Sequence, residues 1–150
     1  MGRPGGAHRL RSAGFTLMEL LVVVAIIAFA SAGVSFALRD SAAAQLEREA
    51  LRLASLLESA RAQSRASGLP LRWRSVEGGF RFEGAAPNTL PERWLGEQTR
   101  VLGAPVLLLG PEPIIGAQEV VLVSPALPQR ALRVTTDGLR PFSVVGESGP

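Results

Sequence analysis

The sequence predicts an α+β protein in which one long N-terminal helix packs on an antiparallel β-sheet or small β-sandwich. Three observations lead to this fold class. Residues 20–38 contain no charge, residues 46–64 place apolar side chains at helical spacing, and the apolar side chains after Pro70 alternate with a period of two. We therefore expect a helix with a transmembrane first half and an amphipathic second half, followed by strands.

Charge distribution argues against a nucleic-acid-binding chain. All 16 basic residues are arginine, and Arg3, Arg9 and Arg11 precede Gly14. From Phe15 onward 13 arginines balance 13 acidic residues, so the sequence pI of about 11.2 reflects no basic stripe. Nucleic acid is not an expected partner.

The residue types needed for most catalytic or metal sites are missing from the sequence. It contains no cysteine, tyrosine or lysine, and its single histidine, His8, lies in the basic N-terminal segment. One histidine cannot form a metal cluster or a triad. The sequence therefore predicts a protein that is not an enzyme, with no catalytic residue, cofactor or metal.

The uncharged run from Leu20 to Leu38 is close to the roughly 20 residues that a helix needs to cross about 30 Å of hydrocarbon. Arginines precede it, whereas Arg39 and Asp40 cancel each other after it, so we expect a cytoplasmic N-terminus. A secretory signal peptide cut after Ala32 and a permanent signal anchor are both compatible with this run.

Glu19 at the front of the run argues against a simple signal peptide. Thr16 and Glu19 fit a helix capping box, and an acid in the first turn favours the helix dipole. In a bilayer a carboxylate costs about 2.5–3.5 kcal/mol at the helix centre and less near the end. We therefore expect Glu19 to find a positively charged partner.

The stretch GFTLMELL, residues 14–21, behind a short basic leader resembles the signature of type IV prepilins and type II secretion pseudopilins. The resemblance implies that an inner-membrane prepilin peptidase cuts after Gly14 and N-methylates Phe15. It also implies that Glu19 pairs with the new amine as subunits assemble. An α-amine with a reference pKa of about 8 is largely protonated, so the pair would set the register between neighbouring helices.

No proline lies between Gly14 and Gly68, so residues 15–67 are predicted to form one helix of about 80 Å. Gly68 and Pro70 would end it. A packing stripe is expected at Leu46, Ala50, Leu53, Leu57, Ala60 and Ser64. Other faces are expected to hold Glu47, Arg48, Glu49, Arg52, Glu58, Arg61 and Arg65.

Residues 71–76 and 80–83 alternate in polarity around a glycine turn and predict a β-hairpin. Trp73, Phe80 and Phe82 are expected to face the core. An alternative is that these aromatic side chains and their neighbouring arginines stack on bases, which the neutral net charge disfavours.

The remaining residues predict a loop and further strands. Residues 84–100 are expected to form a surface loop pinned by Trp94, and residues 106–109 and 120–123 to form strands. Residues 131–136 and 139–145 predict a second hairpin, in which Asp137-Gly138 favours a type I′ turn and Pro141 places its strand at an edge or bulge.

The later sequence, including ALRVTTDGLRPFSV at residues 131–144, resembles H-type minor pseudopilins of type II secretion and their FimT-like relatives. This resemblance implies a basic leader at 1–14, a transmembrane and assembly helix at 15–38, an amphipathic exported helix at 39–68 and a periplasmic β domain at 69–150. The subunit would cross the inner membrane once and assemble near the tip of a periplasmic pseudopilus that helps export proteins.

Its implied partners are other minor pseudopilins, the major pseudopilin, the prepilin peptidase, inner-membrane lipid and secreted substrate proteins. Two alternatives stay open at this point. One is a FimT-like type IV minor pilin acting in DNA uptake or pilus assembly, and the other is a soluble protein released after Ala32.

Overall fold

The computed structural model describes residues 16–148. They contain one long helix, α1 (Leu17–Ser67), and strands that pair only in antiparallel fashion. At the end of α1, Gly68 adopts a left-handed conformation (φ 68°) and its N–H donates to the carbonyl of Ser64 at 2.9 Å. The α+β fold and the glycine-terminated helix are therefore as predicted.

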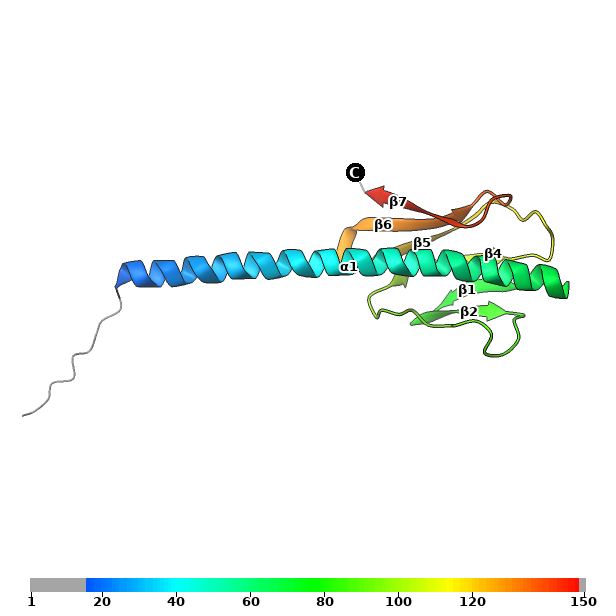
Figure 1. Ribbon diagram of the computed structural model, residues 1–150, viewed down its shortest axis with the longest axis horizontal. Coiled ribbons are helices and arrows are strands. Elements are labelled where there is room, and N and C mark those ends of the chain that lie inside the picture. The colour runs from blue at the N-terminus through cyan, green and yellow to red at the C-terminus, as the bar shows by residue number, and fades with distance from the viewer. Residues whose placement is uncertain (1–15, 149–150) are drawn as a thin grey trace, which may run out of the picture. The chain divides into compact units, whose positions relative to one another are not determined.

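The chain divides into two units, with the boundary between Ala37 and Leu38. All strands belong to the second unit, where they form two sheets (Figure 1). The first sheet has the order β2-β1-β4 and comprises β1 (Arg72–Val76), β2 (Gly79–Glu83) and β4 (Val106–Leu108). The second has the order β3-β5-β6-β7 and comprises β3 (Arg100–Val101), β5 (Gln118–Ser124), β6 (Leu127–Thr136) and β7 (Ser143–Ser148).

A side chain joins the two sheets. The N–H of Leu108 in β4 donates to Oε1 of Gln118 in β5 at 2.7 Å, and Nε2 of Gln118 donates to the carbonyl of Leu108 at 2.9 Å. The amide of Gln118 therefore makes the two bonds that a paired strand residue would make.

One apolar core lies between the second half of α1 and the sheets. The predicted stripe of α1 is buried at every position, from Leu46 to Ser64. The predicted hairpin of β1 and β2 is present, and Trp73, Phe80 and Phe82 are buried in the core as expected. Trp94 pins the loop that follows by packing on Phe80, with ring centroids 4.6 Å apart. Because these rings are buried, no base can stack on Trp73 or Phe80.

The prediction that charged residues of α1 avoid the buried face is wrong at two positions. Glu49 is 1% exposed and Arg61 is 4% exposed. Both lie at the borders of the apolar stripe, where loops from the β region close over α1 and supply polar partners that the helical pattern alone does not reveal.

The second predicted hairpin also differs in its turn. Strands β6 and β7 do pair, but their register starts at Thr135 and Ser143, so Asp137-Gly138 belongs to a longer loop and not to a two-residue type I′ turn. Pro141 lies in this loop, two residues before β7, which is an edge strand of its sheet. The strands predicted at 106–109 and 120–123 are present as β4 and β5, whereas β3 and the tight β5–β6 connection were not predicted.

Candidate assembly helix and the loops held by the second half of α1

The first turn of α1 carries half of the predicted capping box. The N–H of Glu19 donates to Oγ1 of Thr16 at 3.2 Å, and the N–H of Leu20 donates to the carbonyl of Thr16 at 3.2 Å. These bonds satisfy N–H groups that a helix start otherwise leaves open. The predicted cleavage and methylation positions, Gly14 and Phe15, and the leader 1–14 with His8 lie outside the described residues.

The first unit contains an apolar helical surface on all sides. Large apolar side chains from Leu17 to Val34 are exposed, with Leu17 82% and Phe29 81% exposed. An 18-residue window of α1 is apolar enough to cross a membrane, and none of it is buried within the protein. A helix that is hydrophobic all round needs either lipid or other helices around it.

The polar side chains inside this run are bonded to their own helix. Oγ of Ser31 donates to the carbonyl of Ile27 at 2.8 Å, and Oγ of Ser35 donates to the carbonyl of Ser31 at 3.0 Å. Such bonds remove the cost of placing a hydroxyl group in hydrocarbon. The serines are therefore compatible with an apolar environment.

Glu19 is the ionisable residue of this helical run, because the next charges along the chain are Arg39 and Asp40. Its side chain is exposed and makes no ion pair or hydrogen bond with any other residue in the range 16–148. A carboxylate in this setting has room to accept a cation from outside the described part of the chain.

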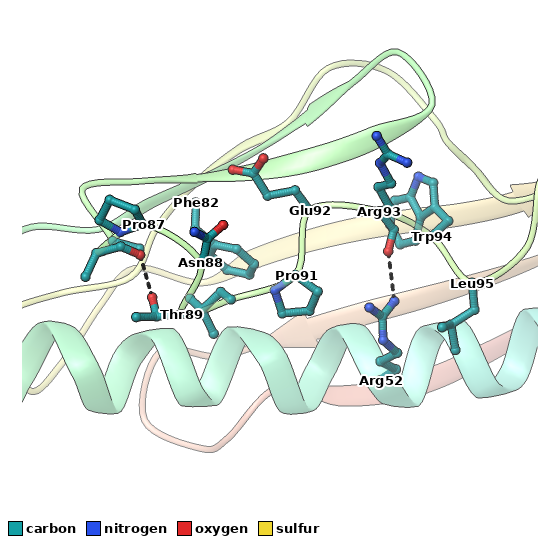
Figure 2. Close-up of a pocket in the computed structure, with 13 residues that line it drawn as sticks. Arg52, Phe82, Pro87, Asn88, Thr89, Pro91, Glu92, Arg93, Trp94 and Leu95 are labelled. Carbon is teal, nitrogen blue, oxygen red and sulfur yellow. Dashed lines mark hydrogen bonds between the residues drawn. The ribbon is translucent and has the colours of Figure 1, made fainter.

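The second half of α1 contributes two Glu-Arg pairs, each of which holds a loop. In the first pair, Oε1 of Glu49 accepts the N–H groups of Leu95 and Gly96, the latter at 3.0 Å. Arg52 pairs with Glu49 at 3.3 Å. It also donates to the carbonyl of Arg93 at 3.1 Å (Figure 2). We call this the first loop clamp.

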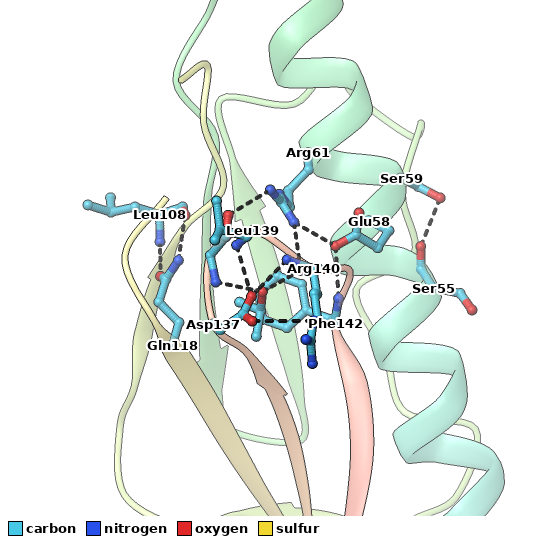
Figure 3. Close-up of polar contacts among 12 residues, drawn as sticks. Ser55, Glu58, Ser59, Arg61, Leu108, Gln118, Asp137, Leu139, Arg140 and Phe142 are labelled. Atoms are coloured by element: carbon cyan, nitrogen blue, oxygen red, sulfur yellow. Dashed lines mark hydrogen bonds and ion pairs between the residues drawn. The ribbon is translucent and has the colours of Figure 1, made fainter. Parts of the chain in front are cut away.

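The second loop clamp lies nine residues further along α1 and holds the β6–β7 loop (Figure 3). Oε1 of Glu58 accepts the N–H of Phe142 at 3.0 Å and pairs with Arg61 at 3.0 Å. The guanidinium of Arg61 in turn donates to the carbonyls of Gly138 and Arg140, both at 3.5 Å. In both clamps the carboxylate accepts hydrogen bonds from backbone N–H groups, and the arginine donates hydrogen bonds to backbone carbonyls.

Asp137 shapes the loop that the second clamp holds. Its Oδ1 accepts the N–H of Arg140 at 2.7 Å and that of Leu139 at 2.9 Å (Figure 3). These backbone hydrogen bonds, that of Arg140 first, lower the pKa of the Asp137 carboxyl below its ordinary value. The Asp-Gly pair in the sequence predicts a turn at this place, but the turn belongs to a loop longer than the type I′ turn that the pair favours.

A surface hollow of about 820 Å³ lies beside the first loop clamp, between Arg52 of α1 and residues 85–95 (Figure 2). Two of its polar side chains are bonded within the protein. Arg52 binds Glu49 and the carbonyl of Arg93, and Oγ1 of Thr89 donates to the carbonyl of Ala86 at 2.7 Å. Among residues 16–148, no group of three or more acidic or histidine side chains is placed to hold a metal ion.

Comparison with protein families identifies the N-terminal region. The model of the prokaryotic N-terminal methylation motif matches residues 9–35, a range that contains Gly14, Phe15 and Glu19. The chain carries a prepilin-like signal. No curated protein and no solved structure matches the chain.

This match supports a prepilin-like protein, either a type IV pilin-like precursor or a pseudopilin precursor. A prepilin-like signal points to a structural subunit that does not catalyse a reaction. Together with the exposed apolar helix, it supports membrane anchoring of this prepilin-like chain. The match ends at residue 35, so it carries no information on the β region.

Proposed function

We propose that this chain is a minor pseudopilin of a type II secretion system that assembles near the tip of a periplasmic pseudopilus. Prepilin peptidase would remove residues 1–14 and N-methylate Phe15. The mature subunit would cross the inner membrane once, with its β domain in the periplasm. The observation that carries the proposal is the methylation motif at residues 9–35 on a helix whose apolar side chains are left uncovered.

Removal of the leader has two physical consequences in this proposal. It takes away Arg3, Arg9 and Arg11, which would resist movement of the helix out of the bilayer. It also creates an ammonium group at Phe15, which Glu19 of a neighbouring subunit would meet in low dielectric. Because Glu19 can accept such an amine, we place the subunit beneath the extreme tip.

The partners follow from the same arrangement. The apolar helix would pack against the helices of the major pseudopilin and other minor pseudopilins, and against inner-membrane lipid before assembly. The two loop clamps support a rigid periplasmic domain, because they fix residues 93–96 and 138–142 to the helix that enters the filament. Secreted proteins would contact this domain.

The test is mass spectrometry of the mature N-terminus, with the chain expressed beside its own peptidase. A product that begins with methylated Phe15 is expected, and a Gly14→Val variant should keep its leader. A product that keeps the leader in the wild type contradicts the proposal, and a product that begins at Gly33 indicates a secreted protein instead.

A second candidate is a FimT-like minor pilin that binds DNA, and one feature of the first sheet favours it. Arg74 lies opposite Arg81, and Arg72 lies opposite Glu83, so three arginines and one carboxylate share the outer face of β1 and β2. Against it, the buried aromatic rings of this sheet offer no stacking surface.

Salt-dependent DNA binding of the full chain in detergent separates the two candidates. DNA uptake requires binding at low ionic strength that weakens with salt and falls in an Arg72→Gln, Arg81→Gln double variant. Arg48→Gln on the exposed side of α1 is the matched control. Absence of binding at low salt eliminates this candidate.

A further inference from the structure

A small hollow lies where α1 leaves the apolar run. It has a volume of about 290 Å³ and is lined by Arg39, Ala126, Leu127, Pro128, Gln129 and Arg130. In Figure 1 the beginning of β6 (orange) lies beside α1 at this place. The hollow therefore combines one arginine of the helix with one arginine of the first residues of β6, and none of its six lining residues is acidic.

The two arginines differ in how they are held. Arg130 donates from Nη2 to Oε1 of Glu47 on α1, and this bond fixes its guanidinium while its side chain stays 36% exposed. The side chain of Arg39 is exposed and makes no ion pair or hydrogen bond with any other described residue. Asp40 follows Arg39, but about 100° further round the helix, and it does not line the hollow. Arg39 thus brings a charge that the lining does not neutralise.

The position of Arg39 along the chain suggests what its charge meets. It is the first charged residue after the 19 uncharged residues from Leu20 to Leu38, which span about 28 Å as a helix. When this run fills the hydrocarbon layer, Arg39 reaches the headgroup layer on the far side. Guanidinium groups bind phosphate oxygens through paired hydrogen bonds, and Gln129 offers a further amide donor.

We propose that Arg39, Arg130 and the β5–β6 turn bind the phosphate of an anionic phospholipid headgroup in the periplasmic leaflet. This inference rests on the proposed membrane insertion of residues 20–38. The lipid phosphate supplies the countercharge that Arg39 lacks, and it seats the β5–β6 turn and the first residues of β6 on the membrane surface. The subunit must then release this lipid when it is drawn into a filament.

Native mass spectrometry of the full chain in mild detergent tests the site, with phosphatidylglycerol and phosphatidylcholine of the same chain length added as probes. We expect the wild type to prefer phosphatidylglycerol by about tenfold, as one charge-assisted contact allows. Arg39→Gln and Arg130→Gln should each remove most of this preference. Arg48→Gln, an exposed arginine nine residues further along α1, should keep it.

Three results would overturn the proposal. The first is an unchanged preference for phosphatidylglycerol in both Arg39→Gln and Arg130→Gln. The second is a loss of this preference in Arg48→Gln as large as in those two variants. The third is displacement of the lipid by millimolar glycerol phosphate, which would indicate a site for soluble phosphate. The thermal unfolding of Arg39→Gln should match the wild type, because the side chain of Arg39 makes no polar bond with any described residue.

The mature N-terminus is measured in the same samples. A product that begins at Gly33 refutes the membrane insertion and the proposed function with it. A membrane-inserted chain that begins at Phe15 but shows no Arg39-dependent lipid preference refutes the phosphate site alone.

Discussion

The carboxylate of Glu49 accepts the backbone N–H of Gly96 at 3.0 Å across 47 residues of sequence, and Glu49 is 1% exposed. The same oxygen accepts the N–H of Leu95. A buried carboxylate is tolerated when such donors and a paired arginine, here Arg52, offset its desolvation. This contact fixes the loop after β2 to the helix and makes Glu49 the central group of the first loop clamp.

Glu49→Ala should lower the free energy of unfolding by about 2–4 kcal/mol, because it leaves two backbone N–H groups and Arg52 without their acceptor. Thermal unfolding of the full chain in detergent, followed by circular dichroism, measures the loss. Glu47→Ala is the matched control, since it removes an exposed carboxylate on the same helix and should cost less than about 1 kcal/mol. Equal losses in the two variants would contradict a special role for Glu49.

The two hydrogen bonds between the Gln118 side chain and the Leu108 backbone allow a test of the connection between the sheets. Gln118→Leu should speed hydrogen exchange at the Leu108 amide by roughly tenfold and lower stability by about 1–2 kcal/mol, because one donor and one acceptor lose their partners. Gln98→Leu, at an exposed position, should change neither quantity. Unaltered exchange at Leu108 would show that the two sheets hold together without this amide.

Gly138 is required by both its conformation and its surroundings. Its φ is 91°, and a Cβ atom there would lie 1.8 Å from the carbonyl oxygen of Ile115. Gly138→Ala should therefore destabilise the β6–β7 loop by about 2 kcal/mol or more and lower the thermal midpoint by several degrees. Gly116→Ala is the control, because no atom lies within 4 Å of its added Cβ. A midpoint for Gly138→Ala that matches the control would contradict this geometry.

The same loop should respond to acid through Asp137. Hydrogen bonds from the N–H groups of Arg140 and Leu139 lower its pKa in the folded state. Because the folded pKa is lowered, the ionised carboxylate stabilises the folded state fully above the unfolded pKa of about 3.9. This stabilisation is lost as pH falls through the folded pKa. Asp137→Asn should thus be less stable than the wild type at pH 7, and the difference should shrink toward pH 2. A difference independent of pH would contradict this assignment.

Residue periodicity predicted those parts of the fold that depend only on which face of a single helix or strand is apolar. The stripe from Leu46 to Ser64, the β1–β2 hairpin and the inward aromatic rings all follow from a period of 3.6 or 2 and from burial of apolar area. Periodicity could not place Glu49 or Arg61, because a charged side chain at the border of a stripe is buried only if a distant loop supplies partners.

The turn after β6 was mispredicted for a related reason. Asp137-Gly138 favours a tight hairpin by local preference, but Arg61 and Glu58 of α1 bind the loop and fix its longer path. For the candidate site, the motif around Glu19 could be recognised in the sequence because its residues are the eight adjacent positions 14–21. The hollow lined by Arg39 and Arg130 could not, because these two residues come together only through the fold.

The role of Glu19 can be separated from its place in the helix cap. In the cap, Glu19 contributes a backbone N–H to Oγ1 of Thr16, and this bond does not use the carboxylate. In the proposed assembly contact, the carboxylate alone binds the amine of a neighbouring Phe15. Glu19→Gln should therefore leave processing, membrane insertion and helix content intact, yet reduce copurification with the major pseudopilin by tenfold or more, because the loss of a desolvated ion pair costs at least about 1.4 kcal/mol.

Thr16→Val provides the opposite variant, since it removes the cap acceptor and keeps the charge. It should cost about 1 kcal/mol at the helix start and leave copurification near the wild-type level. Processing is read from the mass of the mature N-terminus, and assembly from crosslinking in the membrane fraction. If both variants lose assembly equally, the helix start and not the carboxylate sets the contact. If Glu19→Gln assembles like the wild type, the register role assigned to Glu19 is wrong.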